Sequence, residues 1–451
     1  MSAELLNRYK NKRVSVVVLG DFGRSPRMQY HALSLSKNDF QVDVIAYKGA
    51  EPLQQISNDD HIHLHYMKEV PKFLEVFPKL VQYVLKTVWQ AFTLFCVLLS
   101  VAKVDGILLQ NPPSIPTLPI CWLISCIRSC YLFVDFHNYG FTILSLKAKK
   151  GSLLVKIAKW CEMYFGRKCD KSICVTKAMK DDLSQNWNVR ASVFYDCAPD
   201  IFHPIPLKEK HQFFDMMSKD VKKFRANSNA SEVGKTTRFT KEIDNKYELL
   251  TDRPALVVSS TSWTEDEDFS ILLSELEDYE QASKTKVGLP NLLVVITGKG
   301  PLKSYYEKQI EKMNFNHVEI ITLWLKLEDY PTLLACADLG VSLHSSSSGL
   351  DLPMKVVDMF GCCLPVAAVS FNCIDELVKN GVNGTIFKTS QELSEQLQLM
   401  FDGFPTKRTA LSTFHENLRN TSALKWEENW NHTVLPLLRE LHAKRALHQN
   451  C

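Results

Sequence analysis

The sequence predicts two α/β domains, each built on a doubly wound parallel sheet, that face one another across a cleft. Apolar runs of strand length alternate with helical stretches, and this alternation stops at a polar region and then starts again. The length of 451 residues suits two or three domains. We therefore expect a first domain over 12–204, a linker or insertion over 205–250, a second domain over 251–425, and a helix over 426–447 that packs back on the first domain.

The first domain opens with a β-loop-α-β unit. Residues 13–20 form a short apolar run that ends in glycine, which is typical of a buried parallel strand. A tight loop, a helix over about 26–35 and a second strand over 41–46 follow. The further strands that we expect in this domain lie at 106–109, 131–135 and 172–175.

The second domain repeats the pattern. A strand over 255–259 precedes a helix over 269–280, and a strand over 291–297 ends in a glycine-rich turn. Because ligands of such sheets bind beyond the carboxyl ends of the strands, the loops after the strands are where we look for a site. The further strands that we expect lie at 318–322, 339–343 and 365–369.

The composition excludes several classes of protein. Hydrophobic residues make up 45% and charged residues 23%, which is an ordinary globular balance and excludes a disordered or collagen-like chain. The net charge of +3 is too low for a general nucleic-acid binder. The 13 cysteines are scattered, and the close pair Cys362-Cys363 lacks metal-ligand spacing. Reduced thiols in a cytosolic setting, without structural zinc, fit this pattern.

One segment raises the question of a membrane. Residues 87–102 read TVWQAFTLFCVLLSVA, 16 residues without a charge. A spanning helix needs about 18 to 20 apolar residues, so a buried core helix or a helix that dips into one leaflet fits better. Residues 147–180 contain ten Lys or Arg against two acidic residues, which favours an anionic membrane surface.

The segment 345–361 has the features of an anion-binding loop. Its serines and a glycine follow the strand expected at 339–343, and Pro353 suits the first turn of a helix. A helix N-terminus favours an anion such as a diphosphate. Lys355 and Asp358 share a helix face, so one can reach phosphate while the other accepts from ribose hydroxyls. A serine-rich loop beside a surface ion pair is the plain alternative.

This arrangement resembles the donor half of GT-B glycosyltransferases. Asp358 precedes Gly361-Cys362-Cys363-Leu364-Pro365-Val366 and occupies the position where those enzymes usually have the glutamate that binds ribose. The turn Gly298-Lys299-Gly300-Pro301 resembles their G-x-G-P turn. The donor-binding residues that we expect are Gly298, Lys299, Gly300, Ser347, Ser348, Gly349, Leu350, Lys355 and Asp358.

Five segments in order resemble one family, the eukaryotic chitobiosyldiphosphodolichol β-mannosyltransferases. The resemblance implies an inverting β-1,4 transfer of the first mannose from GDP-mannose to GlcNAc2-diphosphate-dolichol, during lipid-linked oligosaccharide assembly for N-glycosylation. It also implies the cytosolic face of the endoplasmic reticulum membrane, and other mannosyltransferases of the pathway as partners. The segments that carry it are 20–31, 109–113, 135–140, 259–269 and 345–366.

Two departures from the resemblance matter. Members of the family begin with a membrane anchor, whereas this sequence starts close to its first strand, so either the apolar segment 87–102 with the basic stretch serves for attachment or an exon is missing. In addition, the loop 259–269 supplies four acids where GT-B enzymes often supply Arg and Lys to the diphosphate. We expect Lys299 and Lys355 to take that role.

An inverting transfer also needs a general base for the acceptor hydroxyl. Histidine is suited to proton transfer near neutral pH, and Asp135 is close enough in sequence to orient His137, so His137 is the first candidate. Asp21 in the first loop is the second, and Glu265 or Asp266 is the third. The plain alternatives are that Asp21 caps the next helix and that Asp135 merely ends a strand.

The acceptor diphosphate calls for arginine, because a guanidinium pairs with phosphate through two parallel hydrogen bonds. Arg24 and Arg27 are the expected ligands, with Gly23 and Asn138 beside them. The stretch 266–268 has the letters of a D-x-D metal motif but lies before a helix. We therefore expect no obligatory metal cofactor, with Mg²⁺ assisting at most from solution.

Three other functions stay open. Another GDP-mannose-dependent GT-B mannosyltransferase of the same pathway would share the fold and the donor. A non-catalytic scaffold paralogue would keep the fold alone, although the intact glycine-rich turn and the Lys355–Asp358 pair argue against it. A nucleotide-sugar epimerase would also use α/β domains.

Overall fold

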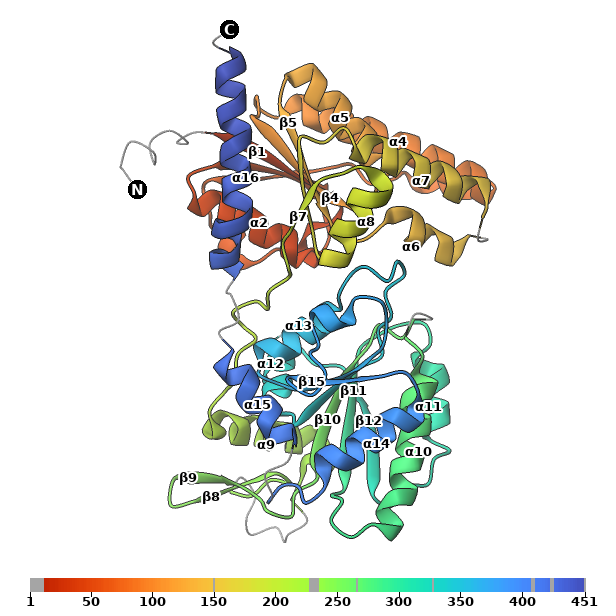
Figure 1. Cartoon of the computed structure of the whole chain (residues 1–451), viewed down its shortest axis with the longest axis vertical. Helices are drawn as coiled ribbons and strands as arrows, with labels where there is room; N and C mark the ends of the chain where they lie inside the picture. Colours follow the sequence, from red (N-terminus) through yellow and green to blue (C-terminus); the bar gives the residue numbers. More distant parts are fainter. Residues whose placement is uncertain are drawn as a thin grey trace. The chain divides into compact units, whose positions relative to one another are not determined.

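The computed structural model describes residues 12–148, 151–226, 235–264, 267–326, 328–406, 410–421 and 426–449. The chain forms two compact units (Figure 1). The first unit comprises Met1–Asp196 with Lys425–Cys451, and the second comprises Cys197–Leu424. Each unit has a parallel sheet with helices on its faces, so the prediction of two doubly wound α/β domains is confirmed.

The first sheet has seven strands in the order β3-β2-β1-β4-β5-β6-β7, all parallel. The order changes direction at β1 and β4, the switch point where ligands of such sheets bind. The central strands are buried on both faces, which explains their continuous apolar runs. The strands are β1 (Arg13–Asp21), β2 (Gln41–Tyr47), β3 (Ile62–Tyr66), β4 (Gly106–Asn111), β5 (Tyr131–Phe136), β6 (Lys171–Cys174) and β7 (Ala191–Val193).

Helices cover this sheet, and the C-terminal helix of the chain belongs to the same unit. Trp430 on that helix donates through its indole Nε1 to His31 Nδ1 at 2.9 Å, and Trp426 donates to Ser34 Oγ at 3.0 Å. These bonds join it to the helix after β1. The helices are α2 (Pro26–Lys37), α3 (Gln54–Ser57), α4 (Lys79–Ser100), α5 (Thr117–Arg128), α6 (Gly140–Lys147), α7 (Leu153–Gly166), α8 (Lys177–Trp187) and α16 (Trp426–Gln449).

The second sheet has six parallel strands in the order β12-β11-β10-β13-β14-β15. The strands are β10 (Ala255–Ser260), β11 (Leu292–Thr297), β12 (Val318–Leu323), β13 (Leu339–Ser342), β14 (Val366–Val369) and β15 (Gly384–Phe387). Its helices are α10 (Phe269–Thr285), α11 (Lys303–Ile310), α12 (Asp329–Cys336), α13 (Met354–Gly361), α14 (Ser390–Phe401) and α15 (Ala410–Asn420).

The stretch 205–250 was expected to be a linker or an insertion, and the structure shows that it is not an irregular linker. It contains helix α9 (Leu207–Asp220) and an antiparallel hairpin of β8 (Thr240–Ile243) and β9 (Lys246–Leu249). The polar composition hides a few apolar positions that enter the core of the second unit, which begins at Cys197 rather than after 204. These core residues are Phe213, Phe214, Met217, Phe224 and Phe239.

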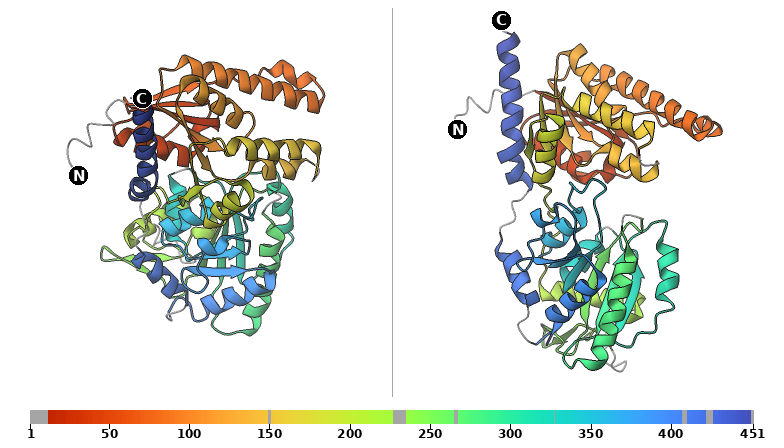
Figure 2. Two further views of the ribbon diagram at one scale, coloured as in Figure 1. Left: turned by 45° about the horizontal axis from the view of Figure 1, so that its top comes forward. Right: turned by 45° about the vertical axis from the view of Figure 1, so that its right-hand side comes forward.

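Helix α4 exposes an apolar face. Among the described residues it contains the one stretch long and apolar enough to cross a membrane, Val81–Ser100, of which only 17% is buried. The expectation of a buried core helix is therefore wrong. Leu94 and Leu98 pack into the unit, whereas Val88 and Phe92 are exposed. Helices α4, α5, α7 and α6 follow one another as neighbours on this side of the sheet (Figure 2).

Candidate active site

A buried ionic cluster lies at the carboxyl end of β5. Asp135 is the penultimate residue of this strand and is fully buried. Its carboxylate accepts hydrogen bonds from Arg27 at 2.8 and 3.0 Å, is 3.0 Å from His31 Nε2, and is 2.9 Å from His137 Nε2. Arg27 also donates to Asp196 at 2.7 Å. We call these five residues the Asp135 cluster, and Asp135 is plainly more than the end of a strand.

The cluster corrects one predicted ligand. Arg27 is only 6% exposed and is used by two carboxylates and by the carbonyl oxygen of Phe194, so it is not offered to an acceptor diphosphate. Arg24 differs, because its side chain is 80% exposed and contacts only Asp21, at 3.4 Å, among the ion pairs of the described residues. Of the two predicted arginines, Arg24 alone is placed to bind an external anion.

The electrostatics of the cluster are dominated by Asp135. Burial by itself would raise the pKa of Asp135, but Arg27, His137 and the hydrogen bonds from both histidines hold it well below its usual range. Burial also lowers the pKa of His31, against the opposing effect of its bond to Asp135. The carboxylate is therefore ionised at every physiological pH, and His31 is neutral.

His137 is the exposed edge of this cluster. Its side chain is 21% exposed, and its backbone N–H donates to the carbonyl oxygen of Asn111 at the end of β4, 2.8 Å away. Because Asp135 is an ionised acceptor, Nε2 carries the proton of that bond in the neutral imidazole of His137, which leaves the lone pair on Nδ1. The structure thus brings the first candidate base and its orienting carboxylate together.

A buried glutamate holds the loop after His137, and the sequence reasoning missed it. Glu162 on α7 accepts from Asn111 Nδ2 at 2.7 Å and from the backbone N–H groups of Gly140 and Phe141 at 2.9 and 3.2 Å. The carboxylate satisfies the first N–H groups of α6. The predicted acceptor residue Asn138 belongs to this loop, where its Oδ1 accepts from the next backbone N–H. Glu162 is the single acid of α7, and that was the available signal.

Asp21 does not cap the helix after it. Its side chain makes no cap hydrogen bond; Oδ2 accepts from Ala50 N–H at 2.9 Å, and Oδ1 is buried with no hydrogen-bond partner among the described residues. Asp21 therefore stays the second candidate base. Gly23 lies beside it, where a Cβ would come within 2.2 Å of the Ala50 carbonyl oxygen, so this glycine permits close backbone packing.

The second unit has a cavity at the carboxyl ends of β10, β11 and β12. Its volume is about 310 Å³, and both Lys355 and Asp358 of α13 line it, as their spacing predicts. Polar groups of two strand ends and three aromatic or aliphatic side chains complete the wall. The lining residues are Ser260, Thr261, Thr297, Gly298, Trp324, Leu325, Lys326, Tyr330, Lys355 and Asp358. We call this the α13 cavity.

The glycine-rich turn after β11 forms part of its wall. Gly298 has a φ of +140°, and a Cβ there would lie 1.8 Å from the Thr261 carbonyl oxygen. A Cβ on Gly300 would lie 1.8 Å from the Ser262 carbonyl oxygen. Both glycines therefore let this turn pack against the loop after β10. Between them, Lys299 places its ammonium over the ring of Trp324, 3.9 Å from the ring centroid.

Glu267, one of the four acids of the loop after β10, has a structural role in that loop. Its buried carboxylate pairs with Lys355 and accepts from Ser262 N–H at 2.7 Å, so one acid both builds the loop and orients the lysine. Asp268 caps α10 by accepting from Ser270 N–H at 3.0 Å, which agrees with the position of 266–268 directly before a helix. The third candidate base, Glu265 or Asp266, lies outside the described residues.

The serine-rich loop is built by its own hydrogen bonds. Ser346 Oγ accepts from Gly349 N–H at 2.9 Å and donates to the Asp351 carboxylate, while Ser348 Oγ accepts from Leu350 N–H at 3.2 Å. Gly349 has a φ of +72°, which favours glycine. The predicted donor ligands Ser347, Ser348, Gly349 and Leu350 all belong to this loop, just before α13. Among the described residues, none of them lines the α13 cavity.

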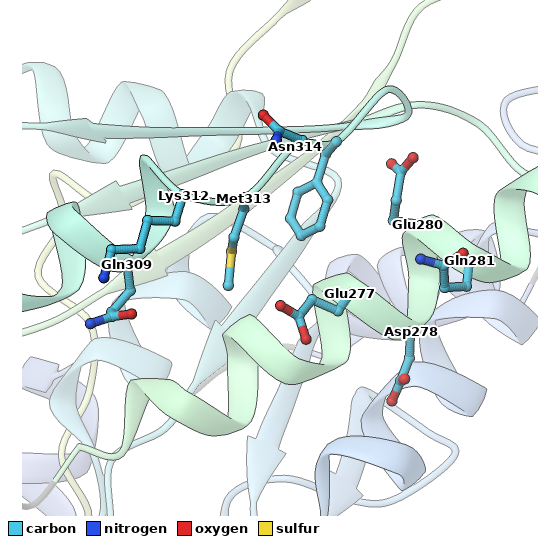
Figure 3. Close-up of a pocket in the computed structure, with 9 residues that line it drawn as sticks. Glu277, Asp278, Glu280, Gln281, Gln309, Lys312, Met313 and Asn314 are labelled. Atoms are coloured by element: carbon cyan, nitrogen blue, oxygen red, sulfur yellow. The ribbon is translucent and has the colours of Figure 1, made fainter.

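A second cavity of about 560 Å³ lies elsewhere on this unit (Figure 3). It is formed by acidic and amide side chains of α10 and by the segment from Gln309 to Phe315. Glu280 there accepts from the backbone N–H groups of Asn316, His317 and Val318, at the start of β12. This is the amino-terminal edge of the sheet, and Glu280 is occupied with holding the strand, so we do not count this cavity in the candidate site.

The two sheets and these sites define the class of the protein. Residues 276–412 match the family model described as glycosyl transferases group 1. Sucrose-phosphate synthase from Thermosynechococcus elongatus has the same fold, with a TM-score of 0.63 and 12% identity over 96% of this chain and 100% of that chain. The protein is a glycosyltransferase of the GT-B fold.

Full-length relatives define the family more narrowly. The human chitobiosyldiphosphodolichol beta-mannosyltransferase is 47% identical over 431 residues, 95% of this chain and 92% of its own. A relative from Arabidopsis thaliana, named UDP-glycosyltransferase TURAN, is 45% identical over 97% of this chain and 99% of its own. The chain belongs to the chitobiosyldiphosphodolichol beta-mannosyltransferase family.

Proposed function

We propose that the protein transfers mannose from GDP-mannose to O4 of the terminal GlcNAc in GlcNAc2-diphosphate-dolichol, with inversion to a β-1,4 linkage. The identity to the human relative over nearly the whole chain carries this proposal. The substrate follows from that relative's name, and the guanine nucleotide follows from the family resemblance. The site geometry supports donor binding by the second unit and deprotonation of the acceptor by the first unit.

The α13 cavity is proposed as the donor site. Asp358 accepts from the ribose hydroxyls, and Lys355 with Lys299 faces the diphosphate, whose charge grows as GDP leaves. Lys355 already pairs with Glu267, so binding of the diphosphate shifts its ammonium from one anion to another. The loop of Ser347 to Leu350 directly precedes α13 and is proposed to contact the donor beyond the residues that line the cavity. We propose that no protein-bound metal is obligatory.

His137 is proposed as the general base. Its Nδ1 takes the proton of the acceptor O4 while that oxygen attacks C1 of mannose and the bond to GDP breaks. Asp135 stabilises the imidazolium that forms, because its carboxylate is 2.9 Å from His137 Nε2. Asp21 is the alternative base. Arg24, the exposed arginine, is proposed to bind the acceptor diphosphate.

Attachment to the cytosolic face of the endoplasmic reticulum membrane is proposed to use helices α4 and α7, which both contact α5. Val88 and Phe92 on α4 and Leu153 and Trp160 on α7 are all exposed apolar side chains. Lysines stand among them on α7, which suits an anionic lipid surface. We propose further that other mannosyltransferases of the pathway assemble with the protein on that membrane.

The attachment is tested by exchange of exposed side chains. In a flotation assay with anionic vesicles, Val88→Ser with Phe92→Ser should move the protein from the floating vesicle fraction to the bottom fraction. Val287→Ser with Leu399→Ser makes a similar change at exposed positions of the second unit and should not. Equal release by both pairs, or by neither, would contradict this surface.

One assay tests the activity. The protein is incubated with GDP-[labelled mannose] and phytanyl- or dolichyl-linked chitobiose, and the product is digested with β-mannosidase. We expect a labelled lipid that β-mannosidase cleaves, and turnover that survives EDTA. Cleavage by α-mannosidase instead would identify another mannosyltransferase, and GDP binding without turnover would favour a scaffold. UDP-sugars serve as the control for the nucleotide.

A further inference from the structure

A hydrogen-bond chain runs from the C-terminal helix to His137. Trp430 on α16 donates to His31 Nδ1 at 2.9 Å, and His31 Nε2 is 3.0 Å from the Asp135 carboxylate. The same carboxylate oxygen is 2.9 Å from His137 Nε2. Trp430, His31 and Asp135 are essentially buried, and only His137 reaches the surface.

The chemistry of the first bond fixes the state of His31. An indole N–H is a donor only, so His31 Nδ1 must accept and carries no proton. The proton of a neutral imidazole is then on Nε2, where it is donated to Asp135. A second proton on His31 would have to sit on Nδ1 and point at the indole N–H. Trp430 thus excludes the imidazolium form of His31 by geometry.

The charge balance of the cluster depends on this exclusion. Asp135 and Asp196 bring two negative charges, and Arg27 brings one positive charge. With His31 neutral, one negative charge is left for the imidazolium that forms at His137 during transfer. With His31 charged, the cluster would have no net charge before the reaction. The imidazolium of His137 would then lose the net negative charge that stabilises it.

We propose that Trp430 and His31 are positioning residues for catalysis. The indole N–H keeps His31 a neutral hydrogen-bond donor, so that the negative charge of Asp135 stabilises the imidazolium of His137. This inference rests on the proposed role of His137 as the base. The groups that face His31 are Arg27 on its own helix, Asp135 on β5, and His137 after it. Trp426, Trp430 and Phe194 pack around the ring.

Helix α16 supplies a matched pair of variants. Trp430→Phe removes the N–H that faces His31, whereas Trp426→Phe removes an N–H that faces Ser34 Oγ and makes the same loss of volume. Trp430→Phe should lower kcat by about three- to tenfold, with the KM for both substrates unchanged. The acid limb of the kcat–pH profile of Trp430→Phe should move to lower pH, because a positive charge on His31 makes His137 a weaker base. Trp426→Phe should change neither kcat nor the acid limb.

A second substitution tests the charge directly. His31→Gln keeps a neutral N–H donor for Asp135 and an acceptor for Trp430, and it cannot take up a proton. In a His31→Gln background, the further change Trp430→Phe should therefore cost nothing more in kcat. His31→Leu, which cannot donate, should lose more activity than His31→Gln. Additive losses in the double variant would overturn the proposal.

The state of His31 is also measurable without turnover. In ¹⁵N-histidine NMR of the whole protein, His31 should be the neutral Nε2–H form from pH 8 to about pH 5, and Trp430→Phe should make it titrate within that range. A charged or Nδ1–H form in the wild type would overturn the proposal, as would equal kcat losses in the two tryptophan variants. Absence of mannose transfer together with the expected NMR result would instead refute the proposed function.

Discussion

The Asp135 cluster and the α13 cavity use charge in opposite ways. In the cluster, Asp135 is surrounded by one guanidinium and two imidazoles, and only His137 is appreciably exposed. In the cavity, Lys355 and Asp358 stand in an open space of about 310 Å³ among aromatic and aliphatic side chains. The first arrangement is complete before any ligand arrives, which suits proton transfer. The second arrangement has an open volume, and its Lys355 can exchange the Glu267 carboxylate for a ligand anion, which suits binding.

The largest effect should come from the exposed end of the cluster. His137→Ala should lower kcat by about 10² to 10⁴, the usual range for loss of a general base. His137→Asn should not restore it if the ring takes up a proton. Asp21→Asn keeps the shape of its side chain and should leave most of the activity. Loss of transfer in Asp21→Asn with near-normal transfer in His137→Asn would reverse the two assignments.

The buried arginine should matter for stability rather than for acceptor binding. Arg27→Ala removes the single guanidinium that pairs with Asp135 and Asp196 in the interior, and it should destabilise the first unit by about 3–5 kcal/mol. Arg24→Ala is the matched control, since it removes an exposed guanidinium from the same motif, and should change stability by less than about 0.5 kcal/mol. Urea unfolding of both variants measures this, and similar stabilities would contradict the buried pairing.

The sequence predicted the residue pairs that are close together along the chain. It did not predict the contacts between residues that are far apart in the sequence. Asp135 and His137 are two positions apart, and Lys355 and Asp358 share a helical face, so local spacing predicted both pairs. Arg27 was misassigned because its partner Asp135 lies 108 residues away. The Trp430–His31 bond joins residues 399 apart, and no periodicity reports it.

The strands were predictable for a different reason. Residues buried on both faces of a parallel sheet must be apolar without interruption, and such runs stand out. The region 205–250 shows the limit of that signal. Its core contacts come from a few aromatic residues, such as Phe213 and Phe239, set among charges, so composition alone indicated a linker or an insertion.

A smaller effect is expected in the cavity. Asp358→Ala should weaken GDP binding by about 1.5–3 kcal/mol, the worth of a hydrogen bond to a charged group, which is roughly a 10- to 150-fold rise in Kd. Lys355→Ala should weaken binding through the diphosphate and lower turnover too. Asp329→Ala, on a neighbouring helix and outside the cavity lining, is the control. Unchanged GDP affinity in both cavity variants would remove the donor site from α13.

The pH dependence of stability should differ between the wild type and Asp135→Asn. Because the folded pKa of Asp135 is lowered, its ionised form stabilises the fold above the unfolded pKa of about 4, and this contribution fades as pH falls toward the folded pKa. The stability difference between wild type and variant should therefore be constant from pH 7 to about 5 and shrink below about pH 4. Urea titrations at several pH values measure it, and a difference that grew on acidification would contradict the sign.

The division of labour itself is tested most directly by calorimetric titration of GDP into His137→Ala and Asp358→Ala, each with its kcat measured on the same preparation. The account predicts that His137→Ala binds GDP with wild-type affinity while its transfer falls by about 10² or more, and that Asp358→Ala loses affinity by about tenfold or more. A fall in GDP affinity for His137→Ala as large as that for Asp358→Ala would contradict it.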